Sequence, residues 1–189
     1  MTSTDVTPLA RFDRAAATAT AVVDAISPEQ FGDPTPCTDW TVRQLLNHLT
    51  GGTRFFVSMV TGGEPVDRTA DHVGTDHRAS FRDSVADLRA AFAADGALAG
   101  TYQGPLGEAS GHTLLRMRVN EMMVHAWDLA HATGQSTDLD PELAAGCLED
   151  IRRVQEAGRA GRTFKPVQPY PEDATVADKL AATAGRTVK

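Results

Sequence analysis

One stretch of the chain decides the fold: Leu114-Leu115-Arg116-Met117-Arg118-Val119-Asn120-Glu121-Met122-Met123-Val124-His125-Ala126-Trp127-Asp128-Leu129. It contains neither glycine nor proline, and its apolar residues recur at steps of three and four, a spacing that predicts a helix. Gly134 follows closely and is typical of a residue that ends a helix. We therefore expect a helix from about Thr113 to Thr133.

One face of this helix carries ionisable side chains. Alternating steps of four and three place five residues on the same side: Leu114, Arg118, Glu121, His125 and Asp128. In a helix bundle a seam with this spacing normally faces the core, where charged side chains are rare unless they are paired or bind a metal. The seam is therefore the leading candidate for a metal or catalytic site. A solvated Glu–His pair, which stabilises a helix by a few tenths of a kcal/mol, fits the same spacing.

Length and composition indicate one globular domain. The chain has 189 residues, of which 41% are hydrophobic and 23% are charged. The net charge of -7 and the lack of a basic cluster argue against nucleic-acid binding. No apolar run approaches the roughly 18 residues of a membrane span, and residues 1–5 do not resemble a secretory signal. Cys37 and Cys147 lie far apart without a CxxC motif, so we expect a reduced, cytoplasmic protein.

Capping signals mark the other helices. Thr7 and Pro8 suit the N-cap and the first helical position, and Thr41 with Gln44 forms a capping box. We expect further helices from Pro8 to about Ile26, from Thr41 to about Gly62, from His77 to Ala94, at 141–157 and from Val176 to Ala184, and a short strand or hairpin arm at Thr101–Gln103.

Four long helices with two long connections are typical of a four-helix bundle. We therefore predict an all-α fold in a single domain, 1–189. Its bundle core spans about 7–134, and a short C-terminal extension of helices and extended tail spans 135–189.

A histidine and two glycines stand out in the second expected helix. His48 lies at the edge of the apolar stripe that contains Leu45 and Leu49. A half-buried histidine bonded to a carbonyl is the alternative to a ligand role. Gly51 and Gly52 follow, and each costs about 1 kcal/mol relative to alanine inside a helix. We expect either a local break in the helix or the close approach of another group to its backbone.

Facing helices of a bundle can together supply a metal site. His48, Glu121 and His125 offer two imidazoles and a carboxylate. Three protein ligands with one open position are what catalytic zinc needs. Asp128 or Arg118 would orient a ligating histidine or a substrate anion. For Arg118, an ion pair with Glu121 or Asp128 is an alternative of equal weight.

Other residues of ligand type have simpler interpretations. Cys37 is expected to be a buried small residue rather than a nucleophile, because nothing beside it in the sequence would lower its pKa. We interpret Asp71, His72, Asp76 and His77 as parts of a solvated loop, since no regular spacing fixes them relative to one another.

Two motifs resemble the signatures of actinobacterial DinB-like proteins, and more narrowly those of the metal-binding domain of the mycothiol-dependent maleylpyruvate isomerase family. They are Trp40-Thr41-Val42-Arg43-Gln44-Leu45-Leu46-Asn47-His48-Leu49 and Glu121-Met122-Met123-Val124-His125-Ala126-Trp127-Asp128-Leu129. Thr35-Pro36-Cys37 and the tail around Phe164-Lys165-Pro166-Val167 add to the resemblance, which therefore spans most of the chain.

The resemblance implies a DinB-like bundle in which His48, Glu121 and His125 bind a divalent metal, usually zinc, with nickel or another divalent ion as alternatives. It also implies that the metal activates a low-molecular-weight thiol such as mycothiol toward a small electrophilic substrate, and that the protein forms a homodimer. The isomerases carry an additional C-terminal domain, and we expect this chain to be too short for a full one. The expected enzyme is therefore a thiol-dependent transferase or isomerase whose substrate is open.

Two other functions fit the same residues. One is a metal-stabilised DinB-like bundle that binds a ligand or a stress signal without turnover. The other is a metal-assisted hydrolase, which would use bound water in place of a thiol. Thiol-dependent loss of an electrophile would separate the enzyme from the binding protein.

Overall fold

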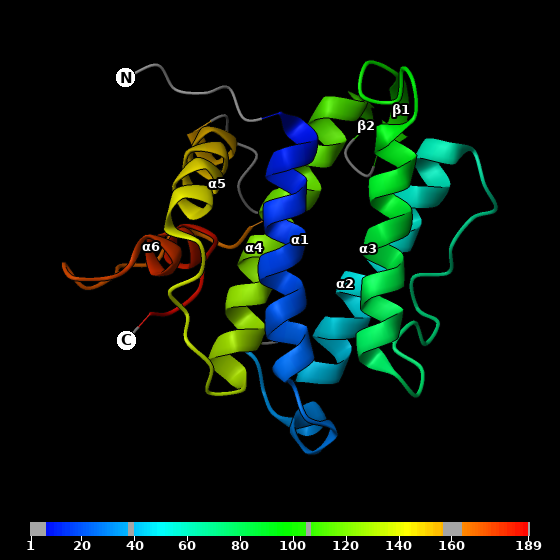
Figure 1. Ribbon diagram of the computed structural model, residues 1–189. Coiled ribbons are helices and arrows are strands. Elements are labelled where there is room, and N and C mark those ends of the chain that lie inside the picture. The colour runs from blue at the N-terminus through cyan, green and yellow to red at the C-terminus, as the bar shows by residue number, and fades with distance from the viewer. Residues whose placement is uncertain (1–6, 38–39, 105–106, 157–163, 189) are drawn as a thin grey trace.

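A computed structural model describes residues 7–37, 40–104, 107–156 and 164–188. It shows a bundle of four long helices (Figure 1): α1 (Pro8–Ala25), α2 (Val42–Thr61), α3 (His77–Ala93) and α4 (Gly111–Ala132). Each lies within a few residues of its predicted position, so the all-α class and the four-helix bundle are confirmed.

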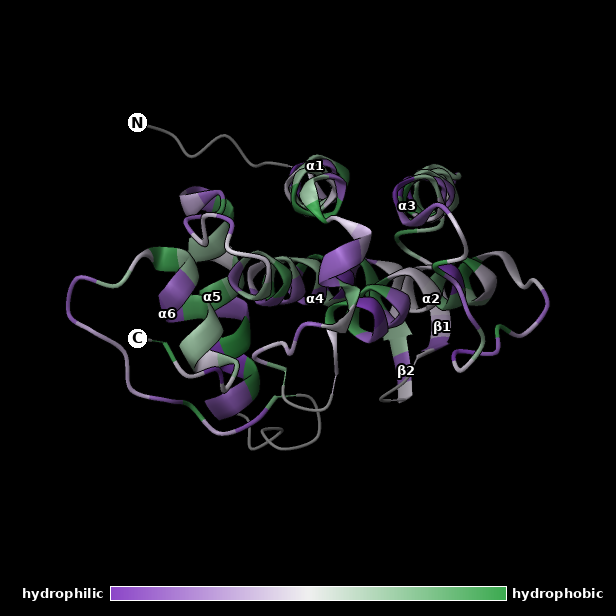
Figure 2. Ribbon diagram, turned by 90° about the horizontal axis from the view of Figure 1, so that it is seen from below, coloured by the Kyte–Doolittle hydropathy of each residue, from purple (hydrophilic) through white to green (hydrophobic). Residues whose placement is uncertain are grey.

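The four helices form two layers, which are visible in the view from below (Figure 2). α1 and α3 lie in one layer, and α4 and α2 lie in the other. α1 packs on α3 and α4, and α2 packs on the same two helices. The two helices that carry the predicted metal ligands, α2 and α4, are therefore direct neighbours.

Side-chain caps fix where the helices begin. Thr7 Oγ1 accepts a hydrogen bond from the Ala10 amide at 3.1 Å at the start of α1. Thr41 and Gln44 form the predicted capping box at the start of α2. Each such cap stabilises a helix by about 1 kcal/mol. Because the cap sets where α2 begins, it also sets the direction in which His48 points.

The connections contain little regular structure. A short 3₁₀ helix, η1 (Pro28–Gly32), lies between α1 and α2. Before α4, β1 (Thr101–Gly104) pairs antiparallel with β2 (Gly107–Ser110), which confirms the expected hairpin arm.

The C-terminal extension covers one side of the bundle. α5 (Pro141–Val154) and α6 (Val176–Thr183) pack on each other and on α4 (Figure 1). The predicted helix 141–157 is thus confirmed as far as Val154, and residue 157 lies outside the described residues. The Trp127 indole N–H of α4 donates to Asp178 of α6 at 2.8 Å. In the described part of the chain, no helix has the length and apolarity needed to cross a membrane.

The two glycines of α2 permit close packing without breaking the helix. A Cβ atom on Gly51 would overlap the His72 ring. A Cβ atom on Gly52 would lie 3.1 Å from Nη1 of Arg118, a residue of α4. Of the two expectations for this site, the close approach of other groups is confirmed.

The interpretation of His72 and His77 as solvated residues was wrong, because both are buried. Asn47 of α2 accepts hydrogen bonds from the His72 amide at 2.6 Å and the Val73 amide at 3.2 Å. These bonds fold the connection onto α2, and the His72 ring fills the space above Gly51. Polar contacts from α2, with Asn47 at their centre, thus help to fix the position of the loop, and residue spacing carried no signal for them.

Candidate metal centre

The polar seam of α4 faces the protein interior, as its spacing predicted. Leu114, Arg118 and Asp128 are fully buried, and His125 is 8% exposed. Glu121 is half-buried. Since ionised groups are costly to bury alone, each charge on this seam requires a partner.

His48 of α2 meets Glu121 and His125 of α4. His48 Nε2 lies 2.8 Å from Glu121 Oε1, and the His48 and His125 ring centroids are 5.3 Å apart. One ligand-type atom from each of the three residues lies within 4.8 Å of the other two. The donor atoms of a tetrahedral zinc with bonds of about 2.0–2.2 Å lie about 3.3–3.6 Å apart. Small side-chain movements would bring these three donors to that spacing, so the residues fit a divalent ion.

The Glu121 carboxylate is held by a buried cation. Arg118 pairs with Glu121 Oε2, and its Nη2 also donates to Thr53 Oγ1 at 3.0 Å and to the Leu49 carbonyl at 3.4 Å. Burial acts to raise the pKa of Glu121, but the Arg118 charge and the His48 hydrogen bond outweigh it, and the pKa lies well below its ordinary value. Glu121 is therefore an anion at neutral pH, as a metal ligand must be.

Asp128 is shared between His125 and the C-terminal tail. Asp128 Oδ2 lies 2.9 Å from His125 Nδ1. Arg186 donates to both Asp128 oxygens, from Nε at 3.0 Å and from Nη2 at 2.7 Å. Burial acts to raise the pKa of Asp128, but its hydrogen bonds with His125 and Arg186 lower it below the ordinary value. An ionised Asp128 favours the tautomer in which His125 Nδ1 carries the proton.

The His125 ring has the protonation state that a metal ligand needs. Burial lowers its pKa below the ordinary value, and the contact with Asp128 offsets only part of that shift. The ring is therefore neutral at pH 7. With Nδ1 engaged by Asp128, Nε2 is the nitrogen left to bind an ion.

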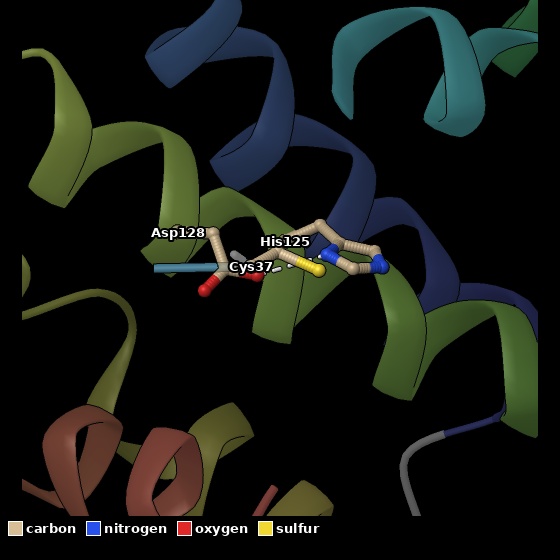
Figure 3. A group of neighbouring side chains, drawn as sticks. All are labelled: Cys37, His125 and Asp128. Atoms are coloured by element: carbon tan, nitrogen blue, oxygen red, sulfur yellow. Dashed lines mark hydrogen bonds and ion pairs between the residues drawn. The ribbon is translucent and has the colours of Figure 1, made fainter. Parts of the chain in front are cut away.

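Cys37 forms a second group of ligand-type atoms with the same histidine. Figure 3 shows Cys37, His125 and Asp128 gathered beside α4. One atom from each lies within 4.8 Å of the other two. The sequence predicted a buried Cys37, but the residue is only half-buried. In this group Asp128 is already engaged by Arg186, so an ion there would have to displace a buried ion pair.

Two parts of the centre were missed from sequence. The Trp40 indole stacks on the His48 ring, with centroids 4.4 Å apart and planes inclined by 26°. Trp40 stands in the same motif as His48, which is the signal that could have found it. Arg186 carries no such signal, because it follows the last expected helix and only the folded tail places it on Asp128.

A pocket of about 500 Å³ opens beside His48. One side comes from the start of α2 and the other from the connection that follows α2. Its lining residues are Trp40, Arg43, Gln44, Asn47, His48, Arg68, Thr69, Ala70 and Asp71. Of the three residues proposed as metal ligands, only His48 reaches this lining.

Known proteins share this sequence pattern. A family model described as the mycothiol maleylpyruvate isomerase N-terminal domain matches residues 12–130, which include His48, Glu121 and His125. Uncharacterized proteins of Mycobacterium tuberculosis, from strains H37Rv and CDC 1551 / Oshkosh, are each 38% identical over 188 residues. The matches cover 96% of this chain and 99% of each relative.

Solved structures share the fold. The crystal structure of the mycothiol-dependent maleylpyruvate isomerase matches with a TM-score of 0.70 at 16% identity, over 95% of this chain and 88% of that chain. A mutant form of that isomerase matches with a TM-score of 0.64 at 15% identity, with the same coverage. At these identities the likeness shows the fold alone, which is the all-α DinB-like fold that the motifs implied.

Proposed function

The chain belongs to the family of the mycothiol maleylpyruvate isomerase N-terminal domain, and from this premise we propose that it is a metal-dependent enzyme in which a low-molecular-weight thiol reacts with a small electrophile. Mycothiol is the thiol named for the isomerase that shares the fold, and we extend it to this chain as part of the proposal. The proposed reaction class is a transferase or an isomerase.

The observation that supports this function best is the meeting of three donor atoms from two neighbouring helices. His48, Glu121 and His125 would hold the ion, with zinc the first choice and nickel or another divalent ion as alternatives. When bound, the ion supplies a Lewis acid that keeps a thiol deprotonated at neutral pH.

The surrounding residues prepare these three side chains. Arg118 keeps Glu121 ionised and holds its carboxylate in place. Asp128 holds the His125 ring with Nδ1 as the donor, which leaves the Nε2 lone pair to bind the ion. Trp40 covers one face of His48 and excludes water from it.

We propose that Arg118 and Asp128 position the metal ligands rather than contact the substrate. The Arg118 side chain has no exposed surface, and its two terminal nitrogens are engaged by Glu121, Thr53 and Leu49. A substrate carboxylate would have to displace that buried ion pair, which costs several kcal/mol.

The test is thiol-dependent turnover by the purified protein. Metal-free and zinc-loaded samples would be incubated with mycothiol and either maleylpyruvate or 1-chloro-2,4-dinitrobenzene, which probe isomerase and transferase activity. We expect conversion of at least one electrophile that requires both zinc and thiol and is lost in His125→Ala. Zinc binding with no thiol-dependent conversion would instead favour the binding protein, and zinc-dependent ester hydrolysis without thiol would favour the hydrolase.

A further inference from the structure

The pocket beside His48, here called the loop pocket, has a fixed wall. Asn47 of α2 donates from Nδ2 to the Ala70 carbonyl at 2.9 Å, and its Oδ1 accepts from the His72 amide at 2.6 Å. Within the loop, the Thr69 amide and hydroxyl both donate to Asp67 Oδ1, at 2.9 and 2.6 Å. The wall is therefore tied to α2 and to itself, so the pocket is preformed rather than opened by a ligand.

The loop pocket contains one arginine that is neutralised and one that is not. Arg43 pairs with Asp71 at 3.0 Å and also donates to the Gly74 carbonyl at 3.3 Å, so its charge is already balanced. The Arg68 guanidinium lies over the Phe55 ring, 5.4 Å from its centroid. Among the described residues, Arg68 has no ion pair or hydrogen bond, which leaves its five N–H donors available to a ligand.

The other end of the loop pocket reaches the metal centre. His48 and Trp40 line it there, and the remaining lining residues are mostly polar. A volume of about 500 Å³ lies within the range of small-molecule sites, about 300–1,000 Å³. A single small molecule can therefore touch the charged wall and the metal-binding side chain together.

We propose that the loop pocket binds a small carboxylate, with Arg68 as the cation that recognises it and with the reacting end of the same molecule directed toward His48. The orientation of the reacting end toward His48 rests on the proposed function. Recognition of the carboxylate by Arg68 does not. Arg68 suits a carboxylate because a guanidinium presents paired N–H groups that match two carboxylate oxygens. Arg68 is exposed, and its contact with the Phe55 ring favours an orientation of the guanidinium over that ring, which reduces the entropy lost on binding.

The carboxylate can come from either reactant. If the electrophile carries it, Arg68 selects among substrates. If the thiol carries it, Arg68 selects among cosubstrates. The site chemistry is the same in both cases, and kinetics with matched acids and amides tells them apart.

The first test uses metal-free protein, so that it does not depend on the metal centre. Succinate and succinamide, which are unreactive, would be titrated by NMR into wild type, Arg68→Met, Arg68→Lys and Arg152→Met. Arg68→Met keeps a long apolar stem against Phe55 but removes the charge. Arg152→Met removes an exposed arginine from α5 as a matched control.

We expect succinate to bind wild type and Arg152→Met equally, and to bind Arg68→Met about tenfold more weakly, because a hydrogen-bonded charge is lost. Arg68→Lys should recover part of the succinate affinity. The affinity for succinamide should be the same in wild type and in all three variants. Equal succinate affinity in wild type and Arg68→Met, or no succinate binding to wild type, would overturn the proposal.

The second test uses zinc-loaded protein and identifies the reactant. N-acetylcysteine is compared with its amide, and an acidic electrophile with its methyl ester. A KM raised in Arg68→Met for only the acidic member of one pair assigns the carboxylate to that reactant. Binding that depends on Arg68 without any turnover would sink the proposed function and leave the carboxylate site standing. If the protein turns over its substrates but neither KM nor succinate affinity changes in Arg68→Met, the carboxylate site is refuted and the proposed function stands.

Discussion

Arg186 donates to both carboxylate oxygens of Asp128, at 3.0 and 2.7 Å, across 58 positions of the sequence. Both side chains are buried. The same carboxylate holds His125 at Nδ1. The C-terminal extension is therefore joined to the candidate metal centre through one shared side chain, and the contact of the tail with Asp128 helps to set the orientation of the His125 ring.

Arg186→Met should weaken zinc binding without unfolding the bundle. Residues that orient a ligating histidine typically contribute about 10- to 100-fold to metal affinity, and we expect a loss in that range. Arg186→Lys keeps a charge but not the paired geometry, so its zinc affinity should lie between those of wild type and Arg186→Met. Zinc affinity would be measured by competition with a chromophoric chelator, and circular dichroism would check the fold. A folded Arg186→Met protein with wild-type zinc affinity would show that the tail is only a structural cover.

Gly51→Ala should lower stability even though alanine is the better helix former. The gain in helix propensity is about 1 kcal/mol, but the new Cβ would overlap the His72 ring. Displacing that ring from its buried position costs about 1–3 kcal/mol, so we expect a net loss of up to about 2 kcal/mol in urea unfolding. Gly32→Ala is the control, since a Cβ there meets no atom of the described residues within 4 Å. Equal stability changes in the two variants would refute the close-packing argument.

The helices could be predicted because their signals are local. The cap at Thr41, the stop at Gly134 and the unbroken helical spacing between Leu114 and Leu129 each act over one or two turns, and the structure follows them. The burial of the α4 seam could also be predicted, because apolar residues flank it on both sides. The seam showed which face of α4 points inward. A third ligand such as His48 therefore had to lie on a helix that packs against that face.

The contacts across the loops could not be predicted. The placement of His72 depends on Asn47, and the placement of Arg186 depends on how the C-terminal tail packs beside α4. Both are side-chain contacts between segments with no regular spacing between them. The loop pocket escaped prediction for the same reason. The expected homodimer and the metal ligation itself stay predictions.

Arg118→Met should strongly destabilise the metal-free protein at neutral pH. The substitution leaves the Glu121 carboxylate without its buried cation, and breaking such a pair costs about 3–5 kcal/mol. The pKa of Glu121 in the folded state lies below its unfolded value. Stability from this pair is therefore fully present above the unfolded pKa of about 4.3 and is lost as the pH falls through the folded pKa.

The difference in unfolding free energy between wild type and Arg118→Met should consequently narrow in acid. Urea unfolding at pH 7, 5 and 3.5 measures it. A difference that is constant over this range would mean that Arg118 contributes packing alone.

Cys147 should make the protein less stable in alkali. Burial raises the pKa of its thiol to about 11. The unfolded thiol ionises from about pH 8.5, so between that pH and about 11 the unfolded state releases its proton first and stability falls. Cys147→Ala leaves a small cavity and lowers stability at pH 7, but it removes this fall of stability with rising pH. Urea unfolding of the two proteins should therefore converge between pH 8.5 and 11, and parallel curves would contradict the assigned pKa.

Anomalous diffraction at the zinc edge tests the central claim most directly. Crystals of zinc-loaded wild-type protein should show one anomalous peak per chain, at about 2.0–2.2 Å from donor atoms of His48, Glu121 and His125. His125→Ala crystals prepared in the same way should show none. A peak held instead by Cys37, His125 and Asp128, or no peak near His48 in fully zinc-loaded crystals, would contradict the metal centre proposed here.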